Sequence, residues 1–503
     1  SILSLTCAEG TRQHGGGFGN LFSQVDFLCR KCGLSTDDMV AVQTMRRHSN
    51  QTGDVTADDF AFDLRALVQF VSAVFGEAVP QRLFERLPVM NRPRMKGLHV
   101  DKRCVRCVVT SWDDRYIQAT TSEGSVTVDY GTTEGGRDFS YLRRMLREGM
   151  QLNLLDCHLE DNIVTPTLVV VEPDFLVDIS SVAACFTPYA HHPLFYTVAR
   201  LKPRPNTQAI LLGNFAGAAL DEIISHPEAT TASTLRRSFR EQALRFCTCD
   251  GFDAALFKRD AEEQMKNIRE AVQVLTAQFS PLGSQFLLEP SFVCERLGLQ
   301  GRVDLMTADM HLLVEQKSGR NMKIERQSHD AHGLQQESHY VQLLLYYGVL
   351  RYNFGRTEKT TDTRLLYSRY PARQGLLSVN YYRTLFREAI RLRNQIVATE
   401  LLVAREGIGR VLPLLSPAYI YKEVEPDDYF LRYVQPELAA ISTQLSALSS
   451  LERAYFERMT TFVYREQLWQ KLGGGTSRLH HSGGAASDLW LMPLSEKRET
   501  GNI

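Results

Sequence analysis

The chain has 503 residues, of which 44% are hydrophobic and 23% are charged, and its formal net charge is −1. This composition is typical of a soluble globular protein, and the length predicts three or four domains. No stretch approaches the ~20 consecutive apolar residues of a membrane helix, and no basic segment precedes the short apolar run at the N-terminus, which excludes a membrane span and an evident secretory signal. Ten irregularly spaced cysteines favour reduced thiols, so we expect a cytoplasmic protein.

Charge is distributed unevenly along the chain. Between Lys317 and Arg410 there are 16 Lys/Arg against 8 Asp/Glu, whereas the rest of the chain has 41 against 50. A basic segment in an otherwise acidic protein is typical of a phosphate-binding groove. An arginine-rich helix face exposed to solvent would give the same count, so charge alone leaves both interpretations open.

In chain order, the hydrophobic patterns predict a multidomain α+β protein. The first segment has apolar residues at helical spacing. The second has short Val-, Thr- and Tyr-rich runs in the order three strands, helix, two strands, which predicts an OB-like β-barrel. The third alternates helices and strands and predicts an α/β core with a mixed sheet. The predicted parts are a helical N-terminal domain (1–95), the barrel (96–170), the α/β core (171–410), a C-terminal helical stalk (411–472), a flexible linker (473–488) and the start of a following domain (489–503).

The stretch LQGRVDLMTADMHLLVEQKSGR holds the residues that point to chemistry. It places Asp304 on one predicted strand and Glu315 and Lys317 on the next. Positions two apart on a strand share a face, and a hairpin can bring Asp304 beside them. Two converging carboxylates favour a hard cation such as Mg²⁺ or Mn²⁺, which activates water, and a lysine stabilises the charge that develops on a phosphate.

Two further polar residues follow on the predicted helix HYVQLLLYYG. Gln342 and Tyr346 lie one turn apart and therefore face the same way. Gln342 is placed to position substrate or Lys317. Each of these residues alone is more often structural than catalytic, but their ordered combination favours a catalytic site.

The motifs GRVDL, ExKSG and QxxxY, with eleven positions from Asp304 to Glu315, resemble those of the RecB-type PD-(D/E)XK nucleases. The segment EPDFLVDISSVAACF is similar to the start of the nuclease domain in the DNA replication ATP-dependent helicase/nuclease family. The resemblance covers about residues 100–410. It implies that 171–410 is a nuclease domain, that an OB-fold precedes it and that a helicase domain follows it. No GxxxxGK[ST] motif occurs in this chain.

The resemblance also implies the roles of particular residues. Asp304, Glu315 and the backbone carbonyl of Gln316 would bind Mg²⁺ or Mn²⁺, and Lys317, Gln342 and Tyr346 would complete the catalytic set. After the catalytic strand, Arg320, Lys323 and Arg326 are expected to bind the DNA backbone, since the arginine fork suits phosphate oxygens. Arg320 is the best placed of the three by sequence.

The sequence departs from the family pattern at two kinds of position. Many members carry a metal-binding histidine in a GxxxH run, but Gly217 stands at that position here, and Asp221 or Glu222 is a candidate substitute. Members also often hold an iron-sulfur cluster whose last three cysteines follow the QxxxY helix. No cysteine follows Cys294, so we expect no such cluster.

The cysteine pairs Cys29/Cys32 and Cys104/Cys107 are each CxxC, which makes a shared zinc conceivable. The distance between the pairs is far longer than in compact zinc modules, and the second pair falls in a strand pattern.

Two functions of different classes follow from the sequence. The first is a metal-dependent DNA nuclease that cuts single-stranded or flapped DNA as part of a helicase-nuclease in replication or repair. The second is a catalytically weak, nuclease-like DNA-binding scaffold for a linked helicase. A protein-interaction platform on the barrel and the terminal helices is compatible with either.

Overall fold

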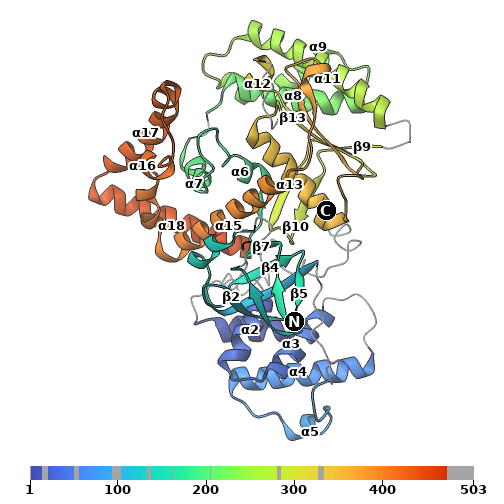
Figure 1. Cartoon of the computed structure of the whole chain (residues 1–503), viewed down its shortest axis with the longest axis vertical. Helices are drawn as coiled ribbons and strands as arrows, with labels where there is room; N and C mark the ends of the chain where they lie inside the picture. Colours follow the sequence, from blue (N-terminus) through green and yellow to red (C-terminus); the bar gives the residue numbers. More distant parts are fainter. Residues whose placement is uncertain are drawn as a thin grey trace. The chain divides into compact units, whose positions relative to one another are not determined.

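A computed structural model describes residues 2–13, 21–49, 56–92, 103–131, 133, 137–160, 162–203, 205–279, 285–326 and 333–472. These residues form two compact units, drawn in Figure 1. The first contains 1–177, 293–299 and the residues from 390 on, and the second contains 178–292 and 300–389. The predicted linker (473–488) and following domain (489–503) lie outside the described residues, and the six-part division remains a prediction. Within the described residues, no helix is long and apolar enough to cross a membrane.

The first unit begins with helices that enclose a small apolar core. Helix starts and ends follow from local sequence: the Ser35 side chain accepts a hydrogen bond from the amide of Asp38, the Thr56 side chain accepts one from Asp59, and Gly76 ends a helix at φ 70°. The helices are α1 (Ile2–Thr11), α2 (Leu21–Lys31), α3 (Thr36–His48), α4 (Ala57–Phe75) and α5 (Gln81–Phe84).

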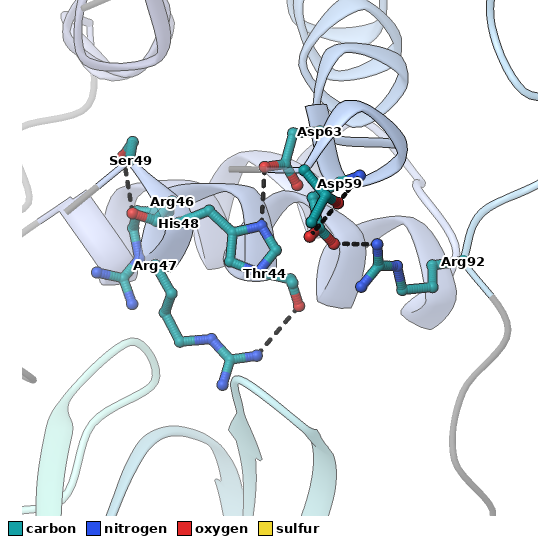
Figure 2. A network of polar contacts seen from close by, with 9 residues as sticks. Thr44, Arg46, Arg47, His48, Ser49, Asp59, Asp63 and Arg92 are labelled. Atoms are coloured by element: carbon teal, nitrogen blue, oxygen red, sulfur yellow. Dashed lines mark hydrogen bonds and ion pairs between the residues drawn. The ribbon is translucent and has the colours of Figure 1, made fainter. Parts of the chain in front are cut away.

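Figure 2 shows the polar network that joins the end of α3 to the first turns of α4. His48 Nδ1 lies 2.8 Å from an oxygen of Asp63, and Arg92 forms an ion pair with Asp59. Arg47, on α3, also reaches Glu123 at 2.6 Å. The contact between His48 and Asp63 therefore joins α3 to α4, whereas Arg92 and Glu123 connect these helices to other parts of the first unit.

A sheet follows in the first unit. Its described strands pair in the order β5-β6-β3-β2-β1-β4-β7, with β5 and β7 at the edges. The α+β class is thus confirmed, but the OB-like barrel is not shown, because no pairing between described strands closes this sheet. Its elements are β1 (Cys104–Trp112), β2 (Tyr116–Thr121), β3 (Gly124–Asp129), η2 (Ser140–Arg144), β4 (Gln151–Leu155), β5 (His158–Glu160), β6 (Ile163–Thr165) and β7 (Leu168–Val171).

The CxxC pairs do not form a zinc site in the described part of the chain. Cys104 and Cys107 are buried on β1, and no three Cys, His, Asp or Glu side chains among the described residues gather in a metal-binding arrangement. Burial raises the pKa of the Cys107 thiol to about 12. Cys104 and Cys107 are therefore part of the core of this sheet.

The segment 293–299 belongs to the first unit although the residues on both sides of it belong to the second. The Asn153 side chain, on β4, donates hydrogen bonds to the carbonyls of Glu295 at 3.0 Å and Arg296 at 3.1 Å. Leu297 and Leu299 are fully buried. Its neighbouring strands form a small sheet of order β10-β11-β8, with β8 (Val177–Asp178), β10 (Ser291–Cys294) and β11 (Leu299–Arg302).

Arg393 anchors the second half of a long helix in the first unit. Its fully buried guanidinium donates to the carbonyls of Val171, Glu172, Phe175 and Gly298. Backbone carbonyls take the place of water, so the buried charge is solvated by the fold itself. The elements of this region are α15 (Arg383–Glu406), η4 (Ile408–Arg410), η5 (Leu412–Leu414), α16 (Pro417–Ile420), the π-helical η6 (Phe430–Val434), α17 (Gln435–Ser446) and α18 (Ser450–Leu472).

The second unit is built on a mixed sheet of order β15-β14-β13-β12-β9, in which only the β13–β14 pair is parallel. Its helices are α6 (Ile179–Ala183), α7 (Leu194–Leu201), α8 (Gln208–Ser225), α9 (Thr231–Glu241), α10 (Ala243–Cys247), α11 (Ala254–Phe279), α12 (Met322–Glu325), α13 (Glu337–Phe354) and α14 (Ala372–Gly375). Its strands are β9 (Phe286–Leu288), β12 (Leu305–Thr307), β13 (Leu312–Lys317), β14 (Asp362–Tyr367) and β15 (Leu376–Ser378).

Alternation along β13 assigns its side chains to two faces. Leu312 and Val314 pack in the apolar core that α8 and α11 form, and the Gln316 side chain reaches the carbonyl of Ala216 on α8. Glu315 and Lys317 point the other way, toward α13. The central strand therefore presents its polar residues to a helix on each side of the sheet.

Candidate active site

The β12–β13 hairpin brings the first predicted carboxylate to the second. Leu305 pairs with Val314 and Met306 with Leu313, so one step further along this register sets Asp304 opposite Glu315. One Asp304 oxygen accepts a hydrogen bond from the amide of Gln316 at 2.6 Å.

The prediction that Asp304 lies on a strand is wrong in detail. Asp304 occupies a bend between β11 and β12. The carbonyl of Asp304 accepts a hydrogen bond from the amide of Glu289 at 3.0 Å, and the amide of Val303 donates to the carbonyl of Pro290. The bend arises where the chain leaves the sheet of β11 and enters the sheet of β12, so one predicted strand is two short strands.

Glu315, Lys317 and Gln342 form a closed triangle. Lys317 Nζ donates to Glu315 Oε1 and to Gln342 Oε1, both at 2.9 Å, and Gln342 Nε2 donates to Glu315 Oε1 at 2.7 Å. Glu315 is only 3% exposed. Burial, and then the neighbouring Asp304 carboxylate, raise the pKa of Glu315 to about 8. The structure thus brings together three residues that the sequence analysis selected.

Tyr346 contacts the backbone that leads to Asp304. Its hydroxyl donates to the carbonyl of Arg302 at 2.5 Å, and burial raises its pKa. A Cβ on Gly301 would lie only 3.0 Å from the Tyr346 ring. The glycine of the GRVDL motif therefore leaves room for the tyrosine that holds this segment in place.

A cavity of about 390 Å³ opens at the end of β13. Part of its wall is the α8 face with Gly213 and Gly217, where a Cβ on Gly217 would meet nothing within 4 Å. The absence of a side chain at Gly217 leaves this part of the wall open. The lining residues are Gly213, Ala216, Gly217, Asp304, Gln316, Lys317, Ser318, Gly319, Arg320, Gln336 and His339.

His339 is the site residue that sequence reasoning missed. Its Nδ1 lies 3.0 Å from the hydroxyl of Tyr367. Burial, reinforced by the charge of Lys317, lowers the pKa of His339 to about 4, so the ring is neutral near pH 7. The signal was present in the sequence, since His339 precedes Gln342 by three positions on the same helix face.

The three predicted DNA-binding residues lie after β13, in and beside the short helix α12. Arg320 lines the cavity, but its guanidinium donates to both carboxylate oxygens of Glu325, at 3.0 and 2.9 Å. Lys323 is half-buried on α12, and Arg326 is exposed at its end. Their role in DNA binding stays a prediction, and the guanidinium of Arg320 is engaged by Glu325.

Asp221 and Glu222, the candidate substitutes for the family histidine that is replaced by Gly217, lie in different surroundings. Glu222 pairs with Arg237 at 3.2 Å. Asp221, half-buried, has no hydrogen bond or ion pair with any described residue. Burial, and then the charges of Glu289 and Asp304, raise the pKa of Asp221 to about 6. Asp221 rather than Glu222 therefore adds to the negative potential at Asp304.

The residues present fit a divalent cation. The second oxygen of Glu315 is buried and has no hydrogen-bond partner, although the first has two. An unpaired carboxylate oxygen beside a second carboxylate is unfavourable unless a cation neutralises them. Asp304, Glu315 and the backbone carbonyl of Gln316 supply the oxygen ligands that Mg²⁺ and Mn²⁺ prefer.

Comparison with known proteins places this geometry in a family. A family model described as the PD-(D/E)XK nuclease superfamily matches residues 183–457, more than half of the chain. No curated protein matches. A crystal structure from Eubacterium rectale that carries the name "Putative exonuclease" is 12% identical, with 52% of this chain and 88% of that chain covered and a TM-score of 0.29. The family model alone supports the conclusion that this chain belongs to the PD-(D/E)XK nuclease superfamily.

Proposed function

We propose that this protein is a metal-dependent DNA nuclease that hydrolyses phosphodiester bonds of single-stranded or flapped DNA. The observation that carries the proposal is the state of Glu315: one oxygen is held by Lys317 and Gln342, and the other is buried without a partner beside Asp304. That arrangement suits a nuclease better than a binding surface, because a binding surface gains nothing from a buried unpaired carboxylate.

Each residue has a distinct task in this proposal. Mg²⁺ or Mn²⁺, held by Asp304, Glu315 and the carbonyl of Gln316, would activate water and stabilise charge on the phosphate. Lys317, oriented by Gln342, places a cation beside the scissile phosphate. Tyr346 positions the backbone before Asp304 through the carbonyl of Arg302.

Cleavage of end-labelled single-stranded DNA in Mg²⁺ or Mn²⁺ tests the proposal directly. We expect cutting by the natural protein, none in EDTA, and loss of cutting in Lys317→Ala. Lys258→Ala is the matched control, because Lys258 is an exposed lysine of the same unit, 3.9 Å from Glu262. A Lys317→Ala variant that cuts at the rate of the Lys258→Ala variant would contradict the assigned site.

The finer parts of the proposal concern substrate and context. Flapped, single-stranded and fully paired oligonucleotides of one sequence, compared under the same conditions, identify the preferred DNA. We further propose that this chain is the nuclease portion of a RecB-type helicase-nuclease in replication or repair, on the strength of the EPDFLVDISSVAACF segment. A native protein detected at 57.0 kDa, rather than at a much larger mass, would contradict that part.

A nuclease-like DNA-binding scaffold is the second candidate, and the glycine at 217 favours it. Nothing occupies the space where a side chain at Gly217 would begin, so the α8 wall supplies no ligand there. DNA binding without cleavage at any Mg²⁺ or Mn²⁺ concentration would favour the scaffold.

A further inference from the structure

The helices α9 and α10 of the second unit carry a concentration of positive charge that the active site does not use. Residues 231–247 contain four arginines and one glutamate. All four arginines, Arg236, Arg237, Arg240 and Arg245, are exposed. Arg236 and Arg240 lie one turn apart, opposite the face of α9 on which Thr234 and Ser238 are buried.

Arg236, Arg240 and Arg245 have no carboxylate partner among the described residues, which sets them apart from the fourth. Arg237 pairs with Glu222 at 3.2 Å and with Glu241 at 2.9 Å. The Nε of Arg236 donates to the carbonyl of Ala232 within its own helix, which leaves its two terminal nitrogens available. Guanidinium groups without a carboxylate partner attract anions.

In the basic segment between Lys317 and Arg410, in contrast, several arginines bind groups of the protein itself. Arg320 is paired with Glu325, Arg364 is paired with Asp362 at 2.7 Å, and Arg393 is buried among carbonyls. A considerable part of the charge counted between Lys317 and Arg410 therefore supports the fold. The charge on α9 and α10 is available to a partner.

Hydrogen bonds connect this surface to the active-site cavity. The Asn214 side chain, on α8, donates to Gln242 at 2.9 Å, and Gln242 lies between Arg240 and Arg245 at the junction of α9 and α10. Asn214 directly follows Gly213, which lines the cavity beside Asp304 and Lys317. Asn206 fixes the other side, since its side chain donates to the carbonyl of Arg245 at 2.5 Å.

A cluster of aromatic rings lies at the junction of α9 and α10. Phe246 is buried and packs against Phe239, Phe252 and Phe257, with ring centroids 4.2, 5.4 and 5.2 Å away. Leu244, in contrast, is 76% exposed between Arg240 and Arg245. In a single nucleic acid strand, phosphates are accompanied by unpaired bases. Arginines can bind the phosphates, and an exposed apolar side chain near them can contact a base.

We propose that Arg236, Arg240 and Arg245 form a phosphate-binding track that guides a single nucleic acid strand over the α9–α10 junction into the active-site cavity. The inference rests on the proposed nuclease function for its ligand, but it concerns a separate surface. The track would bind the phosphate backbone of the substrate. Arg320 does not account for that binding, because it is paired with Glu325.

Binding measured in EDTA separates the track from catalysis. We would follow the fluorescence anisotropy of a labelled 30-nucleotide dT strand from 50 to 300 mM KCl, with the natural protein and the triple variant Arg236→Gln/Arg240→Gln/Arg245→Gln. For single strands the log–log salt slope changes by about 0.7 per phosphate contact, so we expect it to fall by about 2 units and the affinity near 0.1 M salt to fall about 100-fold. An RNA strand of matching length shows whether the sugar matters.

Arg237→Gln is the matched control, because it removes the same charge from the same helix at a position already neutralised by two glutamates. We expect its salt slope to match that of the natural protein. A triple variant with normal melting temperature and unchanged slope would overturn the track, as would an equal loss in Arg237→Gln. Weakened binding by the triple variant alongside no cleavage by the natural protein would instead overturn the nuclease function and keep the track.

Discussion

Asp221 and Glu222 are neighbours on α8, but their carboxylates lie in different electrostatic environments. Glu222 is neutralised by Arg237, whereas Asp221 has no partner in the described part of the chain and lies in the field of Asp304 and Glu289. The folded protein therefore binds a proton at Asp221 more tightly than the unfolded chain does. Stability from this group is present below about pH 4 and is lost as pH rises through about 6.

We predict that Asp221→Asn raises the melting temperature of the metal-free protein at pH 7, by an amount equivalent to about 1 kcal/mol or less, because Asp221 is half-exposed and screened. The gain should shrink toward pH 4, where the natural aspartate is protonated. Glu222→Gln is the control and should not stabilise, since it breaks an ion pair. Thermal melting in EDTA across this pH range measures both variants, and equal effects would contradict the assigned environment.

Glu315 is a buried carboxylate beside a second carboxylate, Asp304, and a bound cation would neutralise their repulsion. We predict that Asp304→Asn and Glu315→Gln each lower the cleavage rate by at least about 100-fold, since even outer partners of metal ligands change affinity 10–100-fold. DNA binding in EDTA should stay close to that of the natural protein. Calorimetric titration with Mn²⁺ should lose its heat of binding in both variants, whereas undiminished Mn²⁺ binding would show that the ligands lie elsewhere.

At the scale of elements, two glycines with positive φ, Gly298 and Gly149, differ in the space available for a side chain. Gly298 has φ +63°, and a Cβ there would lie 2.2 Å from the Arg393 guanidinium. That guanidinium cannot move aside without breaking hydrogen bonds to several buried carbonyls. Gly149, in the same unit, has φ +80° but open space around it.

We predict that Gly298→Ala destabilises the first unit by about 3 kcal/mol or more, because backbone strain and an overpacked buried charge add together. Gly149→Ala should cost only about 1 to 2 kcal/mol, the strain of a left-handed alanine. Urea unfolding of the two variants measures the difference, and similar midpoints would show that Arg393 relaxes easily.

His191 links α13 to the first turns of α15, which lie in the second unit, through charge. Its ring nitrogens lie 2.7 Å from Glu388 on α15 and 3.0 Å from Glu337 on α13, and these hydrogen bonds raise the pKa of His191 to about 9. Since the folded pKa exceeds the unfolded value near 6.5, the stabilisation is complete below pH 6.5 and is lost as pH rises through about 9.

We predict that the melting temperature of the natural protein falls between pH 6.5 and 9.5 more steeply than that of His191→Gln. The difference should correspond to on the order of 1 to 2 kcal/mol, because both glutamates are more than a third exposed and solvent screens them. His226→Gln, at an exposed histidine of the same unit, should follow the natural protein. Parallel pH profiles for the natural protein and His191→Gln would contradict the assignment.

For the whole molecule, the sequence predicted best those site residues whose relative positions depend only on the period of one strand or one helix. Glu315 and Lys317 could be assigned to one strand face, and Gln342 to a helix face, because these periods are fixed by the backbone. The break at Asp304, the pairing of Arg320 with Glu325 and the neutral His339 depend on contacts between distant segments, which no local pattern contains. The strand order of the first sheet likewise follows from long-range pairing, so short Val-rich runs could not distinguish a barrel from an open sheet.

The return of residues 293–299 to the first unit has a practical consequence for dissecting the protein. The chain crosses between the units at 177/178, 292/293, 299/300 and 389/390, so the unit that contains Asp304 and Glu315 is not a continuous stretch. A fragment of residues 178–389 would retain 293–299 without Asn153, and Leu297 and Leu299 would lose the packing that now buries them. We expect such a fragment to aggregate on expression, and a soluble, cooperatively melting 178–389 would contradict that expectation. Deletion mapping of nuclease activity by successive truncation would therefore report misfolding at sites remote from Asp304.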